Sequence, residues 1–199
     1  MANSIIEICN SALADLGEEP ISSLGDGTKA ARLCSQRWPA VRDAVLRAHP
    51  WNCATTLARL AASAEAPAFG RSRAFPLPTD CLRVLAVECG GADVEEWEAQ
   101  SGALICDDDG PLDLTYVRRL EDPRLYDALL VEALTARLSA TLAYPLTASS
   151  GLGQALWNAY ADKLREARGV DARESSPGRA PQPTDWLSAK LGGSPGALR

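Results

Sequence analysis

The spacing of apolar residues constrains the fold of this chain most, because it changes twice along the sequence. Toward both ends apolar residues recur every third or fourth position, and between them they alternate with polar residues. These periods are typical of helices and strands. They predict an α+β, mainly α protein: a bundle of about four helices, from residues 1–49 and 120–169, with a small antiparallel β-sheet subdomain inserted at residues 50–119. A chain of 199 residues fits one domain with such an insert.

Two helices are expected in the first 48 residues. Ser4 and Glu7 form the capping-box pattern at the start of a helix expected over residues 4–16. A second helix is expected over residues 28–48, with apolar residues facing inward and arginines outward. Pro39 lies inside it and predicts a kink or a brief break, because proline has no amide proton to donate.

Short apolar runs separated by turn residues fill the inserted region. The runs cover residues 51–57, 82–87, 94–98, 103–106 and 112–117. Short strands at this spacing predict an antiparallel meander. The segment Asp107-Asp108-Asp109-Gly110 lacks the alternating acidic positions and the final glutamate of a calcium loop, so we expect a hairpin turn there.

Two further helices are expected after the insert. Asp122, with Pro123 at the first helical position, predicts the start of one that ends near Tyr144. The other is expected from about Ser149 to Arg168, with basic residues in its last turns that suit the helix dipole.

The last thirty residues, 170–199, differ in composition from the rest of the chain. Pro, Gly and Ser occupy twelve of these positions, so the segment buries too little apolar surface to offset its ordering entropy. It nevertheless carries Trp186, Leu187 and Leu191, spaced for one face of a short helix. We therefore expect an extended C-terminal arm in which these three side chains dock onto another protein.

The charge of the chain limits its partners. The formal net charge is −6, and residues 170–199 carry four basic and three acidic side chains, so the acidity resides in the body. Affinity for nucleic acid rests on clustered lysines and arginines, which makes an acidic body a poor general binder of DNA, although DNA can still pass close to it. No run of eighteen apolar residues is present, so we expect no membrane span.

The cysteines do not form a recognisable framework. All six are scattered without a C-x-x-C pair: Cys9, Cys34, Cys53, Cys81, Cys89 and Cys106. The first residues show no basic segment followed by an apolar run, so we expect no signal peptide. We interpret the cysteines as reduced, mostly buried cytosolic thiols that pack as small hydrophobic groups.

Candidate catalytic residues are sparse. His49 is the single histidine and lies at the end of an expected helix, where a boundary role is expected rather than a catalytic one. Residues 25–29 resemble part of a phosphate loop but lack its spacing and its preceding strand. We therefore expect no catalytic residue, no metal and no cofactor, and a protein that is not an enzyme.

Two groups of charged residues in the insert leave alternatives open. Glu95, Glu96 and Glu98 are interpreted as a solvated sheet edge, and a pair of catalytic carboxylates is the alternative. Residues 69–75 combine two arginines with two phenylalanines. That patch is too small to bind nucleic acid alone, so we expect a protein contact or a solvated loop.

Three stretches of the sequence resemble one known family in order and type. They are Ala12-Leu13-Ala14-Asp15-Leu16-Gly17-Glu18-Glu19-Pro20-Ile21-Ser22-Ser23-Leu24, His49-Pro50-Trp51-Asn52-Cys53-Ala54 and Phe75-Pro76-Leu77-Pro78-Thr79-Asp80-Cys81-Leu82-Arg83-Val84-Leu85. Their succession resembles the tailed-phage head–tail adaptor (connector) proteins of the tail tubular protein A type. The resemblance covers residues 4–168.

The resemblance implies a structural role in the virion. Such adaptors form a ring, usually of twelve subunits, in the neck between capsid and tail, after synthesis in the host cytoplasm. The ring binds below the portal protein, extends the DNA channel without sequence-specific DNA binding, and offers a platform for tail or neck proteins (nozzle, stopper or tail terminator). Two alternatives remain: another non-enzymatic assembly or scaffold protein, or an enzyme built on acidic residues and arginines.

Overall fold

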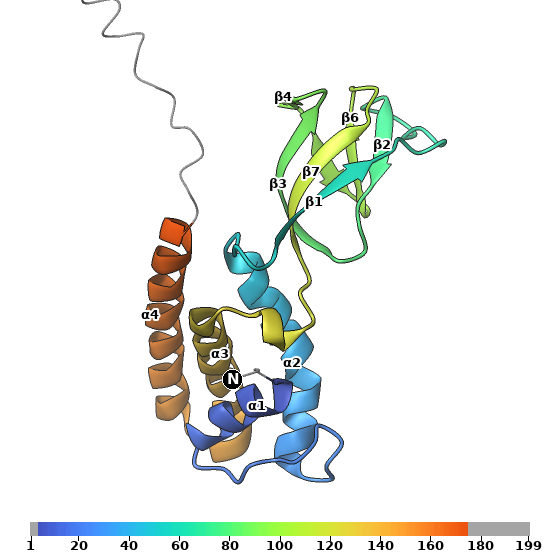
Figure 1. Ribbon diagram of the computed structural model, residues 1–199. Coiled ribbons are helices and arrows are strands. Elements are labelled where there is room, and N and C mark those ends of the chain that lie inside the picture. The colour runs from blue at the N-terminus through green and yellow to red at the C-terminus, as the bar shows by residue number, and fades with distance from the viewer. Residues whose placement is uncertain (1–3, 175–199) are drawn as a thin grey trace, which may run out of the picture.

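The computed structural model describes residues 4–174, and it confirms the mainly α, α+β class (Figure 1). The helices are α1 (Ile5–Ala14), α2 (Lys29–Ala48), α3 (Ala128–Thr147) and α4 (Ser150–Glu174), with a 3₁₀ turn at Pro123–Leu125. The strands are β1 (Thr55–Leu60), β2 (Arg73–Pro76), β3 (Cys81–Cys89), β4 (Ala92–Asp93), β5 (Glu98–Gln100), β6 (Ala103–Cys106) and β7 (Leu112–Arg118). The strands project as a unit beyond one end of α2 (Figure 1).

The first two helices begin close to their expected starts. The Glu7 N–H donates to Ser4 Oγ at 3.1 Å and the Ser4 N–H donates to Glu7 Oε2 at 2.8 Å, which confirms the capping box. Thr28 caps α2 by accepting a 3.1 Å hydrogen bond from the Ala31 N–H. Helix α2 runs on through Pro39, so the alternative of a break is wrong. Apolar packing along the buried face of α2 holds both halves of the helix in place.

The third and fourth helices differ from the expectation at their ends. Asp122 and Pro123 open only the 3₁₀ turn, and α3 begins after Asp127, which caps it. Helix α4 continues past Gly169, so residues 170–174 are helical and the expected arm boundary at residue 170 is wrong. One glycine costs a helix only about 1 kcal/mol, which the packing of the following turn offsets.

Helix α3 is the central helix of the bundle and packs against the other three. Ala133, Ala136, Ala140 and Ala143 are buried and lie along one face of it. Where α4 meets this face, a Cβ added to Gly153 would lie 3.9 Å from that of Ala143. Small side chains at these positions let the two helix backbones approach each other closely.

Two antiparallel sheets form the inserted subdomain, in place of the expected meander. One has the order β1-β7-β3-β4 and the other β2-β6-β5. The first strand of the insert therefore pairs with the last, with Thr55 opposite Val117. Residues 107–110 connect β6 to β7, which lie in different sheets, so the expected hairpin turn is wrong. Hydrophobic patterns locate strands but do not specify which distant strands pair.

The apolar interior is divided into two cores. The larger core fills the helical bundle and includes Trp51 and Val117. The second lies between the two sheets and includes Phe75, Leu104 and Leu114. Burying a side chain of this size contributes about 1.5–3 kcal/mol, so the inserted subdomain has its own source of stability.

Gly110 provides a test of the second core. Its φ is +73°, and a Cβ added there would lie 2.6 Å from Cε1 of the buried Phe75. We expect Gly110→Ala to lower the free energy of unfolding by about 2–5 kcal/mol, because left-handed backbone and overpacking each destabilise. Urea denaturation measures this. Gly91→Ala is the control, since its φ is +84° with no atom within 4 Å, and an equal loss there would contradict the role of packing against Phe75.

Candidate interaction surfaces

A buried polar cluster joins the end of α2 to the last turns of α4. His49 Nε2 lies 2.9 Å from Asp171 Oδ2, and both residues are buried. The Asn52 N–H donates to Asp171 Oδ1 at 3.1 Å, and the Asn52 side-chain amide donates to the Asp171 carbonyl oxygen at 2.8 Å. His49 is the C-cap of α2, which confirms its expected boundary role. The cluster therefore fastens α4 to the start of the inserted subdomain.

A groove of about 660 Å³ lies beside this cluster. Its lining comes from His49 and from α4: Tyr160, Ala161, Leu164, Arg165, Arg168, Gly169 and Ala172. In the Ser–His and Cys–His types of nucleophilic catalysis, a serine or threonine hydroxyl or a cysteine thiol lies within reach of the imidazole. The lining residues include no serine, threonine or cysteine. The groove thus offers apolar surface bordered by arginines.

Asp171 is a residue that sequence reasoning missed, because it lies beyond the expected end of the last helix. Tyr160, Ala167 and Asp171 are buried and continue one helical face across Gly169. That continuation of the spacing is the signal that identifies the longer helix and places Asp171 on its inner face.

The two arginines of residues 69–75 are engaged by acidic side chains. Arg71 donates to Glu96 and to Asp107, each at 2.8 Å, and Arg73 pairs with Asp109 at 2.8 Å. The hydrogen bond from Arg71 is the main cause that lowers the pKa of Asp107. The patch therefore presents little net positive charge to a partner.

The acidic group that follows β4 lies at the surface. Glu95, Glu96 and Glu98 are all exposed, as expected of a solvated edge. Of the three, Glu96 forms the ion pair with Arg71. Their exposure does not favour the alternative of paired catalytic carboxylates, since a raised carboxyl pKa requires burial or a close like charge.

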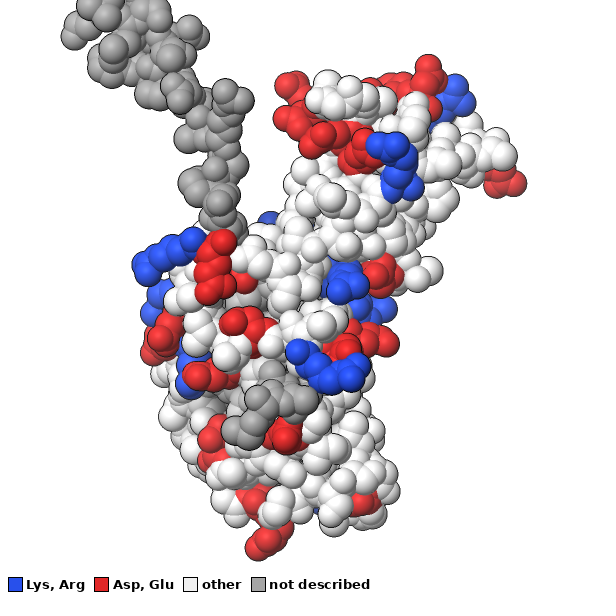
Figure 2. Space-filling model, viewed as in Figure 1, with Lys and Arg blue, Asp and Glu red and all other residues white. Residues whose placement is uncertain are grey.

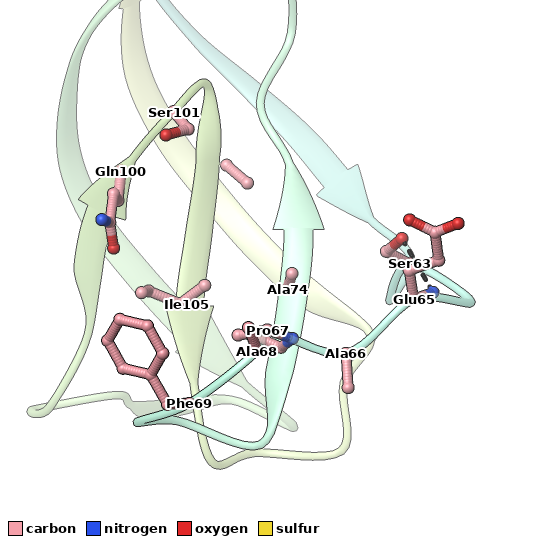
Figure 3. A pocket seen from close by; sticks show the side chains of 11 residues that line it. Ser63, Glu65, Ala66, Pro67, Ala68, Phe69, Ala74, Gln100, Ser101 and Ile105 are labelled. Atoms are coloured by element: carbon pink, nitrogen blue, oxygen red, sulfur yellow. Dashed lines mark hydrogen bonds between the residues drawn. The ribbon is translucent and has the colours of Figure 1, made fainter.

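A shallow pocket of about 390 Å³ lies on the β2-β6-β5 sheet, on the face turned away from the second core. Alternation along the strands places Ala74 and Ile105 on this face. Residues 63–69 border the pocket, and Figure 3 shows the Phe69 ring beside Ile105 and Gln100. The Phe69 side chain is 89% exposed. An exposed ring next to an apolar pocket is a candidate protein contact.

Two of the buried thiols, Cys9 and Cys34, lie within hydrogen-bond distance of each other. All six cysteines are free. The hydrogen bond with Cys34, together with burial, raises the pKa of Cys9. Within residues 4–174 no three His, Cys, Asp or Glu side chains are placed to hold a metal ion. None of the described helices has the length and apolar character needed to cross a membrane.

Two aromatic side chains of α4 lie next to an arginine of α3. The Arg137 guanidinium carbon lies 4.4 Å from the centroid of the Trp157 ring and 5.0 Å from that of Tyr160. Trp157 is 39% exposed and Tyr144, two turns after Arg137, is 66% exposed. Among the described residues, Arg137 has no acidic partner within ion-pair distance. A stacked, unneutralised guanidinium is a recognition group for carboxylates.

Acidic side chains lie around α1. Residues 1–28 contain no lysine or arginine, but they contain five acidic residues, Glu7, Asp15, Glu18, Glu19 and Asp26. Glu7, Asp15 and Glu19 are exposed. Figure 2 shows acidic groups on this lower part of the bundle and again at the outer end of the strands. The expected docking residues Trp186, Leu187 and Leu191 lie outside the described residues.

The cluster around Asp171 predicts a measurable effect on stability. We expect Asp171→Ala to lower the free energy of unfolding by about 1–3 kcal/mol, because it leaves the buried His49 imidazole and the Asn52 N–H without this acceptor. Thermal and urea unfolding measure the loss. Asp162→Ala is the control, because its pair with Arg165 is exposed and is expected to contribute at most about 0.5 kcal/mol. Equal losses in both variants would show that the cluster does not fasten α4.

We compared the sequence with known protein families and with curated proteins. A scan against models of protein families and a search of curated proteins each found no match for the chain.

Proposed function

We propose that the chain is a structural virion protein, a head–tail adaptor that assembles into a ring below the portal. The ring extends the DNA channel and provides the platform for tail attachment; rings of the family it resembles are usually dodecameric. The observation that carries the proposal is the position of the three stretches that resemble this family. Each of them lies at a joint between parts of the fold.

The first stretch, residues 12–24, turns the chain from α1 toward α2. The Asn10 side chain fixes this loop, since its Oδ1 accepts from the Ile21 N–H at 2.8 Å and its Nδ2 donates to the Ile21 carbonyl oxygen at 3.0 Å. Ile21 is buried in the bundle core. The resemblance in this stretch therefore coincides with a loop that hydrogen bonds and a buried side chain hold in place.

The second stretch connects the bundle to the sheets, and the third connects one sheet to the other. Residues 49–54 lead from α2 to β1, and Trp51 anchors them by donating a 2.9 Å hydrogen bond to the Val45 carbonyl oxygen. Residues 75–85 carry the chain from β2 in one sheet to β3 in the other. These joints determine how the strands project from the bundle, which is the geometry that an adaptor between two larger assemblies needs.

Charge suits the passage of DNA through such a ring. The body is acidic, and phosphate binding depends on clustered cations. A channel wall lined by carboxylates repels the DNA backbone, so DNA slides without being held. A ring whose channel wall is lined mainly by arginine and lysine would contradict this part of the proposal.

Residues 175–199, together with helix α4 that precedes them, are proposed to reach the portal or a neighbouring subunit. Burying Trp186, Leu187 and Leu191 contributes on the order of 1.5–3 kcal/mol per side chain. Ordering a segment on binding takes back about 2–5 kcal/mol. One such arm binds weakly, and a ring of arms binds by avidity.

Truncation tests the proposal. We expect deletion of residues 175–199 to leave a protein with the helical circular dichroism of the full chain that no longer binds its portal in co-sedimentation. The deletion begins after α4, so the His49–Asp171 cluster remains intact. Electron microscopy of the full chain mixed with the portal should show a ring below it. Normal portal binding by the truncated protein would refute the assigned docking segment.

Substitutions within the full-length chain distinguish the loss of the docking side chains from the loss of the whole C-terminal segment. The triple variant Trp186→Ala, Leu187→Ala, Leu191→Ala should lose portal binding as the deletion does, because the docking energy is assigned to these apolar groups. The double variant Gln182→Ala, Ser188→Ala is the matched control and should bind normally. A folded chain that associates with itself but never with a portal would favour another assembly or scaffold protein.

A further inference from the structure

We propose that two opposite faces of the helical bundle meet head to tail between neighbouring copies of this chain, with the arginine-bearing face of one copy receiving the acidic face of the next. The inference rests on the proposed ring, because a closed ring needs two different, complementary patches on every subunit. It assigns those patches to particular helices and commits to a second copy of the chain as the occupant.

The first patch, the aromatic–arginine face, runs along α3 and α4. It consists of Arg137, Tyr144, Trp157, Leu164 and Arg168. On α4, Trp157, Ala161, Leu164 and Arg168 follow one another at helical spacing and point in the same direction. Leu164 and Arg168 also line the groove of about 660 Å³ beside His49. The face thus combines exposed aromatic surface with a concave apolar strip.

Charge on this face is positive and uncompensated. Trp157 and Tyr160 hold the Arg137 guanidinium in place by stacking, at 4.4 and 5.0 Å. Stacking on a ring leaves guanidinium N–H donors open for a carboxylate. Among the described residues neither Arg137 nor Arg168 takes part in an ion pair. A partner surface that carries carboxylates can form ion pairs with both arginines.

The second patch, the acidic face, consists of Glu7, Asp15, Glu18 and Glu19. Glu7 and Asp15 lie on and just after α1, and the two glutamates follow in the loop. Residues 1–28 have no lysine or arginine with which to neutralise these carboxylates locally. The acidic face therefore carries negative charge that complements the positive charge of the aromatic–arginine face.

The two patches lie on opposite sides of the layer formed by α3 and α4. Ser139 of α3 donates to Asp15 Oδ2 at 2.7 Å, so this side of α3 faces α1. Successive residues of a helix are about 100° apart, so Arg137 points about 200° away from Ser139. Lys163 of α4 lies on the α1 side, where it pairs with Glu132 of α3 at 2.6 Å. Trp157 stacks on Arg137 and therefore lies on the far side. Patches on opposite sides suit a head-to-tail contact.

Charge reversal tests the pairing in the full-length protein. The acidic-face variant is Glu18→Arg, Glu19→Arg, and the arginine-face variant is Arg137→Glu, Arg168→Glu. The self-association constant of each variant, measured by sedimentation velocity, should be about 100-fold lower than that of wild type, because residues of like charge then face each other in the contact between copies. An equimolar mixture of the two variants should recover association, because each keeps the face that the other needs.

Controls exclude general charge effects. Glu95→Arg and Arg83→Glu, both on exposed positions of the inserted subdomain, should leave self-association unchanged. Circular dichroism checks that every variant is folded, and Arg137→Gln replaces Arg137→Glu if the latter does not fold. Wild-type protein that stays monomeric at millimolar concentration, or a mixture of the two variants that does not associate, would overturn the pairing.

The experiment also separates this inference from the proposed function. Self-association is measured without a portal, and portal binding is measured in parallel. Recovered association of the mixture without any portal binding would support the paired faces and refute the adaptor role. If the protein binds the portal but the charge reversals leave its self-association unchanged, the adaptor role is supported and the assignment of these two faces to the contact between copies is refuted.

Discussion

The pairing of β1 with β7 is the interaction on which the arrangement of the whole chain depends. It places Thr55 opposite Val117, so the insert leaves and re-enters the bundle at almost the same point. The Arg118 N–H donates to the Ala54 carbonyl oxygen at 2.9 Å and extends this closure toward the helices. Because the ends of the insert meet, α2 and α3 pack as neighbours although two sheets separate them in sequence.

The sequence predicts those elements of the fold that local chemistry determines. The capping box at Ser4 and the mainly α, α+β class follow from residue type and period, and the structure confirms them. The two-sheet arrangement could not be predicted, because it depends on pairing between strands far apart in sequence. The sequence pattern predicts an end for α4 that is several residues too early, because Gly169 favours the end of an isolated helix, whereas here Asp171 beyond it is held by the buried His49.

For the candidate surfaces too, the sequence predicts local features, whereas contacts between distant residues depend on the tertiary structure. The arginines and phenylalanines of residues 69–75 are apparent in the sequence, but the ion pairs of these arginines with Asp107 and Asp109 depend on the tertiary structure. Arg137 carried no sequence signal, because only the packing of α3 against α4 brings Trp157 and Tyr160 to it. When side chains from two helices together form a surface site, the site depends on how the helices pack. The apolar periodicity of each helix alone does not predict it.

The closed insert has a consequence for how such a molecule can change over time. Paired residues on neighbouring antiparallel strands lie about 5 Å apart, so a short linker can bridge Thr55 and Val117. Because the strands also bury their own apolar cluster, the segment has the physical properties of a module that can be exchanged as a unit. Its length and outer loops are free to diverge, or to be trimmed or swapped by recombination, while the helices keep their mutual geometry.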